Sequence, residues 1–261
     1  MKAVCAIAGL WAVCVVLCAH ATPQAQNKRV HLFILSGQSN MYYLDPNKSF
    51  TPELRNAFPD DEVIVVKDSM GGQPIGMWVK ITDVQEARGK PYKLYDSLIA
   101  SVRKAIENKT PATITFVWMQ GETDAREPGD ANKAAELYAA SLKCLYRQLR
   151  SDLKREDVDF IIGRINDYGN GMEKYPNWNV IRQTQVQAAE SEARAVWVDT
   201  DDLNGKDNGI HCTSEGYVKL GKRFAEHAIR LITKADRPAS APTSSSSTSI
   251  PAASLPDLHP G

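Results

Sequence analysis

Five short apolar runs divide the chain, and the stretches between them repeat apolar residues at helical spacing. The runs are apolar along most of their length instead of at alternate positions, which is typical of parallel strands that are buried on both faces. We therefore predict an α/β fold: a three-layer α/β/α sandwich with a mainly parallel sheet of about five strands. The predicted strands are Val30–Leu35, Val63–Val66, Ile114–Trp118, Phe160–Ile165 and Val196–Val198.

Three stretches between the strands, and one that follows the last strand, predict helices. In the first of them, Leu94, Leu98 and Val102 follow one another at intervals of four residues, which places them on one face of a helix. The predicted helices are Leu94–Ile106, Ala134–Leu149, Val180–Ala189 and Gly216–Ile232.

The two ends of the chain differ in composition from the middle. A basic start, an apolar run and Ala19-His20-Ala21 make residues 1–21 a predicted cleavable signal peptide, so we expect a secreted or periplasmic protein without membrane contact after cleavage. Residues 235–261 are rich in Ser and Pro and contain few core-forming side chains, which predicts a disordered tail. Residues 28–234 remain, enough for one folded domain.

Charge and cysteine content exclude several classes of function. The 31 basic and 31 acidic residues cancel, so we expect no nucleic-acid partner. Of the five cysteines, only Cys144 and Cys212 lie after the predicted signal peptide, and their spacing matches neither a zinc site nor a disulfide framework. Whether they pair stays open at this point, although we favour two free or buried thiols. We expect no metal and no cofactor.

The sequence Gly37-Gln38-Ser39-Asn40-Met41 directly follows the first predicted strand. The carboxyl ends of parallel strands are where an open α/β sheet binds ligands, and a helix that starts there directs N–H groups at the same point. Ser39 is therefore either a nucleophile or a simple helix cap.

Two further segments end at the same predicted edge of the sheet. Gly71-Gly72-Gln73-Pro74-Ile75 follows the second strand, and its paired glycines either form an ordinary turn or expose an N–H to a ligand. Gln120-Gly121-Glu122-Thr123-Asp124 follows the third strand, and the Gln120 amide is a candidate donor to an oxyanion. The alternative for this second segment is a helix start with favourably placed acidic residues.

His211 is the best candidate for a general base. Of the five histidines, His20 and His259 lie in the two terminal segments, His31 begins a strand and His227 is predicted inside a helix. His211 instead follows the last strand, where a loop can bring it to Ser39. A carboxylate just upstream could orient its ring.

These segments, in this order, resemble the ordered blocks of SGNH hydrolases, and more narrowly the sialate O-acetylesterase-like domain shared with family-six carbohydrate esterases that deacetylate xylan. Arg182 and Gln185 match a helix signature of the same group. The Gly-x-Ser-x-Gly elbow of α/β-hydrolases is absent, because Met41 occupies the second glycine position.

The resemblance implies that Ser39 is the nucleophile and His211 the general base. It implies an oxyanion hole formed by the N–H groups of Ser39 and Gly72 and by the amide of Gln120. We further expect substrate contacts from Gln38, Asn40 and Trp78, with Tyr42 and Tyr43 adding to an aromatic wall that stacks on sugar rings.

The third member of the triad is where this chain departs from the pattern. Many relatives have aspartate three residues before the histidine, and Asn208 stands at that position. Asp207 is our predicted acid, Glu122 is the alternative, and the Asn208 side-chain oxygen is a weaker means of orienting the ring.

The predicted function is a serine esterase that removes O-acetyl groups from carbohydrates through an acyl-enzyme. Two alternatives stay open. One is a glycan-binding protein that has kept the fold and lost catalysis, and the other is an SGNH lipase or thioesterase, which would need an apolar acyl slot.

Overall fold

The computed structural model describes residues 28–79, 93–169 and 173–235. The predicted signal peptide, and the predicted tail beyond Ala235, lie outside the described residues. Five strands form one sheet in the order β2-β1-β3-β4-β5, and every neighbouring pair is parallel. The strands are β1 (Val30–Gly37), β2 (Glu62–Ser69), β3 (Thr113–Met119), β4 (Asp159–Gly163) and β5 (Ala195–Val198).

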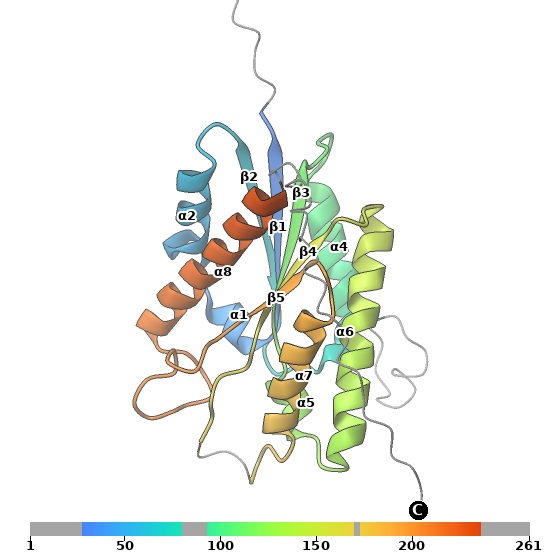
Figure 1. Cartoon of the computed structure of the whole chain (residues 1–261), viewed down its shortest axis with the longest axis vertical. Helices are drawn as coiled ribbons and strands as arrows, with labels where there is room; N and C mark the ends of the chain where they lie inside the picture. Colours follow the sequence, from blue (N-terminus) through green and yellow to red (C-terminus); the bar gives the residue numbers. More distant parts are fainter. Residues whose placement is uncertain (1–27, 80–92, 170–172, 236–261) are drawn as a thin grey trace, which may run out of the picture.

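Helices cover both faces of this sheet, which gives the three layers visible in Figure 1. On one face lie α4 (Lys93–Ala105), α6 (Ala131–Leu153) and α7 (Trp178–Glu190). On the other lie α1 (Ser39–Tyr43), α2 (Phe50–Ala57) and α8 (Ser214–Ala235). Shorter elements connect them: the 3₁₀ turns η1 (Pro46–Lys48) and η2 (Ile75–Trp78), and the helix α5 (Glu122–Arg126).

The predicted α/β/α fold is confirmed, and β1 shows why its sequence is apolar throughout. Leu32 and Ile34 point into the core beneath α4 and α6, whereas Phe33 and Leu35 point into the core beneath α2 and α8, and all four are fully buried. Since consecutive strand residues face opposite sides, a strand covered on both sides needs apolar residues at every position.

Most observed elements differ from their predicted bounds by a few residues, and two differences have a clear physical reason or sequence signal. The fourth strand ends at Gly163 instead of Ile165, because the Ile165 N–H donates to Gln185 Oε1 at 2.9 Å and its carbonyl accepts from Arg182, both on α7. Helix α2 was not predicted, although the buried residues Phe50, Leu54 and Phe58 recur at intervals of four.

The two cysteines after the predicted signal peptide, Cys144 and Cys212, are not joined to each other by a disulfide. Cys144 packs against the core on the α6 side of the sheet, and Cys212 is buried in the core on the α8 side. The sheet therefore lies between them. Within the described residues, no helix is both long enough and apolar enough to cross a membrane.

The strand order places the functional edge of the sheet. From β1 the chain moves to β2 on one side and then to β3 on the other, so β1 and β3 lie where the direction of winding reverses. In doubly wound sheets, ligands bind outside the carboxyl ends of the strands at this switch point. Gly37 ends β1 there, beside Met119 at the end of β3.

Gly37 allows the two strand ends to approach. Its φ is 143°, and a Cβ atom on Gly37 would overlap the Met119 carbonyl oxygen. The next residue continues the contact, since the Gln38 N–H donates to that carbonyl at 2.9 Å.

We predict that Gly37→Ala is strongly destabilising, and Gly129→Ala is its matched control. Gly129 has nearly the same φ, 139°, but nothing lies within 4 Å of the added Cβ. Gly129→Ala should lower the free energy of unfolding by about 1–3 kcal/mol through backbone strain alone. Gly37→Ala should cost about 1–3 kcal/mol more, because a backbone carbonyl cannot move aside. Urea unfolding of both variants measures the difference, and equal losses would contradict the proposed clash.

Candidate active site

Ser39 begins α1 at the carboxyl end of β1, two residues after Gly37. As the first residue of a helix its N–H has no partner within that helix. The preceding Gln38 is 3% exposed, and its side-chain oxygen accepts from the N–H groups of Gly121 and Thr123 at 3.4 and 3.1 Å. The turn that presents Ser39 is thus fastened to the segment that follows β3.

His211 reaches Ser39 from the loop between β5 and α8. Its Nε2 lies 2.9 Å from Ser39 Oγ, which is hydrogen-bond distance. When the ring carries its proton on Nδ1, Nε2 accepts the serine hydroxyl proton, as a general base requires. Partial burial lowers the pKa of His211 below its ordinary value of 6.5, which favours the neutral ring at neutral pH.

Neither predicted acid is hydrogen-bonded to His211 in the described structure. Asp207 is exposed and takes part in no hydrogen bond to the histidine there. Asn208 is in the left-handed region with φ 47°, and its Oδ1 accepts from Asn204 at 2.8 Å. Glu122 is 1% exposed and accepts from Asn40 Nδ2 at 2.7 Å.

Burial raises the pKa of the Glu122 carboxyl group. Desolvation raises its pKa from 4.5 to about 7, despite the opposing hydrogen bond from Asn40, and the nearby Asp124 raises it further. The Oε2 atom has no hydrogen-bond partner among the described residues. A carboxyl group of this kind is costly to ionise.

Asn40 is a structural residue here and not the predicted substrate contact. It is fully buried. Its Nδ2 also donates to the Ile210 carbonyl at 3.0 Å, and its Oδ1 accepts from the Cys212 N–H at 3.1 Å and from the Tyr217 hydroxyl at 3.0 Å. Every hydrogen-bonding position of the carboxamide is therefore occupied by protein.

Gln38 and Trp78 likewise differ from their predicted roles as substrate contacts. Gln38 is buried in the turn described above. Trp78 is 1% exposed, donates from Nε1 to Ser36 Oγ at 3.0 Å and packs edge-on against Trp118 with ring centroids 5.1 Å apart. An aromatic residue near a strand end has here become part of the core.

Gln120 occupies the predicted position, but its amide already has acceptors. It is fully buried, and Nε2 lies within hydrogen-bond distance of Asp124 Oδ2 (2.6 Å), the Gln73 carbonyl (3.1 Å) and Gln38 Oε1 (3.2 Å). An amide group has only two N–H bonds, so none remains for an oxyanion in this arrangement. Gln120 instead holds the loop that contains Gly72.

That loop lies directly against the serine. A Cβ atom on Gly71 would be 3.6 Å from Ser39 Cβ, and Gly72 has a φ of 68°, a left-handed conformation suited to glycine. Asp124, which the sequence analysis did not assign, holds the far end of the loop, because its Oδ2 accepts from the Ile75 N–H at 2.9 Å. The Gly72 N–H belongs to the peptide that follows Gly71, so the loop brings a backbone donor close to Ser39.

Arg182 and Gln185 of α7 hold the loops around the site through hydrogen bonds and an ion pair. Gln185 Nε2 donates to the Gln120 carbonyl at 2.7 Å, and Tyr138 donates its hydroxyl to the same carbonyl at 2.7 Å. Arg182 forms a two-point ion pair with Asp201 at 2.7 and 2.9 Å. These contacts fix the segments that follow β3, β4 and β5.

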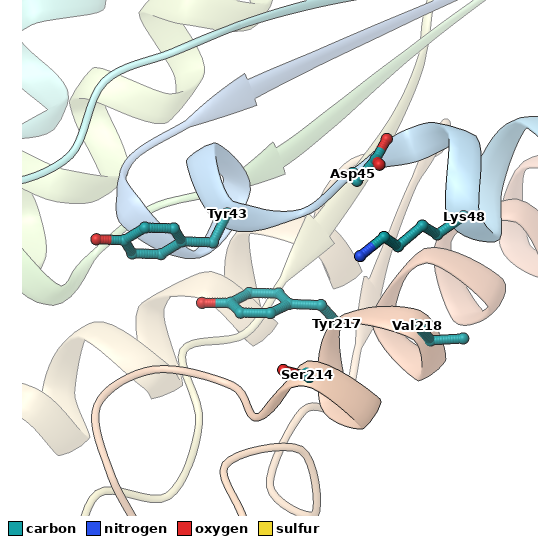
Figure 2. A pocket seen from close by; sticks show the side chains of 6 residues that line it. All are labelled: Tyr43, Asp45, Lys48, Ser214, Tyr217 and Val218. Atoms are coloured by element: carbon teal, nitrogen blue, oxygen red, sulfur yellow. The ribbon is translucent and has the colours of Figure 1, made fainter.

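An open aromatic surface adjoins the histidine. Tyr42 and Tyr43 are more than half exposed, and the Tyr43 ring lies edge-on to His211 with centroids 5.4 Å apart. Tyr43 also borders a pocket of about 250 Å³. Figure 2 shows the rings of Tyr43 and Tyr217 one above the other, with the Lys48 side chain extending toward Tyr217. The residues that line this pocket are Tyr43, Asp45, Lys48, Ser214, Tyr217 and Val218.

Among the described residues, no group of three or more His, Cys, Asp or Glu side chains is arranged to hold a metal ion. Burial raises the pKa of the Cys212 thiol to about 12, so this neighbour of the histidine remains protonated and is not a competing nucleophile.

Comparisons with known proteins identify the family of this chain. Residues 43–230 match a family described as carbohydrate esterase, sialic acid-specific acetylesterase. The match includes Gly72, Gln120 and His211, and it begins just after Ser39. A probable carbohydrate esterase of Arabidopsis thaliana is 27% identical over 184 residues, which cover 69% of this chain and 62% of that protein. The chain thus spans less than two thirds of this relative.

Solved structures share the fold. The crystal structure of the Arabidopsis protein has a TM-score of 0.59 at 19% identity and covers 77% of this chain and 98% of that chain. A carbohydrate acetylesterase from Xanthomonas citri has a TM-score of 0.58 at 17% identity and covers 79% of this chain and 57% of that chain.

We predict that Glu122→Gln stabilises the protein most at alkaline pH. Because its pKa is raised to about 7, the folded chain keeps a proton that the unfolded chain loses above the ordinary value of 4.5. The parent should therefore lose stability between these two pH values, and the neutral variant should not. At pH 8 the variant should gain on the order of 1–3 kcal/mol.

Urea unfolding at pH 5 and pH 8 measures this gain. Glu136→Gln, which alters an exposed carboxylate of α6, is the control and should differ little from the parent at either pH. A Glu122→Gln variant that is less stable than the parent at pH 8 would show that the ionised carboxylate contributes more than its burial costs.

Proposed function

Because the chain belongs to the carbohydrate esterase family of sialic acid-specific acetylesterases, we propose that it is a serine esterase that removes O-acetyl groups from carbohydrates. The observation that carries this proposal is the 2.9 Å contact between Ser39 Oγ and His211 Nε2 at the carboxyl edge of the sheet. A serine and a histidine in this relation form the nucleophile and base of acyl transfer.

The reaction has two halves. Ser39 Oγ attacks the acetyl carbonyl while His211 takes the hydroxyl proton, and the same proton then passes to the leaving sugar oxygen. Water, deprotonated by His211, attacks the acetyl-serine, and His211 returns this proton to Ser39 Oγ as its bond to the acyl carbon breaks. The products are acetate and the free enzyme. The N–H groups of Ser39 and Gly72 bind the oxyanion that forms in each half.

Gln120 supports this oxyanion site indirectly in the proposal. Its amide holds the Gln73 carbonyl at 3.1 Å, one residue beyond Gly72, so the glycine N–H keeps a fixed position. Preorganised donors of this kind are worth more than flexible ones, because they need no reorganisation as charge develops.

The surface beside His211 favours a sugar over a long acyl chain. Tyr43 offers an exposed ring for stacking, and the adjoining pocket carries the charged side chains of Asp45 and Lys48 together with the Ser214 hydroxyl. Aromatic faces combined with polar groups suit carbohydrate rings and hydroxyls, whereas a lipase or thioesterase needs a deeper apolar slot. We also propose that residues 1–21 direct export, so that the enzyme meets extracellular glycans.

We predict that Ser39→Ala lowers acetate release by about a thousandfold or more, because the nucleophile is lost. Acetylated xylan, acetylated sialic acid and p-nitrophenyl acetate are the substrates, and liberated acetate is measured. Ser97→Ala removes an exposed hydroxyl of α4 and should keep full activity.

If the parent and Ser39→Ala were equally inactive on every ester, the esterase proposal would fail. Retained binding of acetylated sugars by both proteins would then support the glycan-binding alternative. A preference for long acyl chains over acetate would support a lipase or thioesterase instead.

We predict that kcat/KM falls on the acid side with a pKa below 6.5, since protonation of His211 removes the base and burial lowers its pKa. Below that pKa the rate should fall about tenfold per pH unit. Glu122 titrates in a neighbouring range, so the profile is repeated with Glu122→Gln. If Glu122→Gln shows the same fall in rate at acid pH, that fall is due to His211. If the fall disappears in this variant, it is due to Glu122.

A further inference from the structure

We infer that Asn40 is the positioning residue of His211, and that its carboxamide takes over the orienting task that an acid performs in a catalytic triad. This inference rests on the proposed esterase function and extends it. Neither the family match nor the sequence pattern assigns this role to Asn40, which the sequence analysis placed among the substrate contacts.

Asn40 holds the peptide groups on both sides of the histidine. Its Nδ2 donates to the carbonyl of Ile210 at 3.0 Å, and its Oδ1 accepts from the N–H of Cys212 at 3.1 Å. His211 lies between these two residues, so one rigid side chain fixes the backbone from which the imidazole projects. Because Asn40 directly follows Ser39, the same short segment places both the nucleophile and the base.

The carboxamide is itself held from two sides. Glu122 Oε1 accepts from Nδ2 at 2.7 Å, and the Tyr217 hydroxyl donates to Oδ1 at 3.0 Å. Asn166 Nδ2, at the carboxyl end of β4, adds a contact of 3.2 Å to the Ile210 carbonyl. With all four of its hydrogen-bonding positions used, Asn40 has no freedom to rotate.

A carboxylate is the usual group that orients a catalytic imidazole ring. In a triad, a carboxylate accepts from Nδ1–H and so sets the tautomer and the orientation of the imidazole. No carboxylate among the described residues is hydrogen-bonded to His211, and burial is the cause that lowers its pKa. In the described structure the ring is therefore placed by the backbone at positions 210 and 212, by Ser39 and by the edge-on Tyr43.

The test exchanges the two ends of the hydrogen bond between Asn40 and Glu122. Asn40→Asp alone places two buried carboxyl groups together and should destabilise the protein. In the double variant Asn40→Asp/Glu122→Gln, the new amide can donate to the new carboxylate, so this bond and the net charge are restored. The bond to the Ile210 carbonyl is not restored, because a carboxylate at position 40 has no N–H to donate.

We expect the double variant to recover most of the thermal stability lost in Asn40→Asp, while kcat stays about a hundredfold below that of the parent. KM should change little, since Asn40 does not touch the substrate. Rates are compared on the plateau of each pH profile, because a carboxylate at position 40 would raise the pKa of His211. Recovery of kcat together with stability would overturn the inference and leave Asn40 with a structural role only.

Two further variants complete the comparison. Leu142→Ala removes a fully buried side chain of α6, on the side of the sheet opposite to α1 and Asn40. It is the control for a loss of stability like that expected of Asn40→Asp. It should keep its kcat at temperatures where it is folded. Asp207→Asn should change kcat less than about threefold, because an exposed side chain without a bond to His211 contributes little. A loss of about a thousandfold or more in Asp207→Asn would assign the orienting role to the acid.

A readout independent of turnover separates this inference from the proposed function. The titration of His211 is followed by NMR in the parent and in the double variant, each with and without Ser39→Ala. In the parent, loss of the Ser39 hydroxyl should shift the His211 midpoint, and in the double variant it should not, because the contact is already broken. An equal shift in both backgrounds would overturn the inference, whereas an inactive parent with the expected shifts would overturn only the esterase function.

Discussion

The tie between the ends of β1 and β3 is the constraint on which the site depends. Gly37 lets the two backbones meet, and the Gln38 N–H bonds to the Met119 carbonyl at 2.9 Å. Next to this contact, Gln38 Oε1 accepts hydrogen bonds from the N–H groups of Gly121 and Thr123. Because the winding of the sheet reverses here, loops from several strands converge on one short turn. A shift of that turn would move Ser39, the proposed nucleophile, together with the backbone N–H groups that we propose bind the oxyanion.

Buried and solvent-accessible residues alternate in the segment Gln38-Ser39-Asn40. Gln38 and Asn40 are buried and make several hydrogen bonds each, whereas Ser39 between them remains partly open. Buried amides are tolerated only when their donors and acceptors are satisfied. Here the hydrogen bonds that satisfy Gln38 and Asn40 hold two separate loops in place. Polar residues next to a nucleophile thus need not touch substrate. In this site they connect Ser39 to the remainder of the fold.

Sequence reasoning could find the sheet and the Ser39–His211 pair, but not the network between them. Strands β1 and β4 were predictable because both of their faces are covered, and apolar residues at most of their positions give a strong signal. Trp78 was assigned to the substrate because it follows the glycine pair, yet its partner Ser36 lies 42 residues away. The partners of Asn40 lie 82 to 177 residues away, and no local pattern encodes such distances. Asp207 likewise depended on a loop conformation in which Asn208 adopts a positive φ, and spacing alone did not reveal it.

No carboxylate among the described residues is hydrogen-bonded to His211, and this arrangement has a physical consequence. When the acid of a serine-protease triad is replaced by its amide, kcat falls by about 10⁴, largely because the ring adopts the wrong tautomer. His211 is exposed enough for Nδ1–H to donate to solvent, and this leaves Nε2 free to accept from Ser39. Solvent stabilises the imidazolium less than a fixed carboxylate does, so such a site suits leaving groups that need little assistance. A sugar alkoxide leaves more readily than an amine from a peptide. The proposed acetyl ester substrate is therefore compatible with a serine and histidine that are positioned as we infer for Asn40.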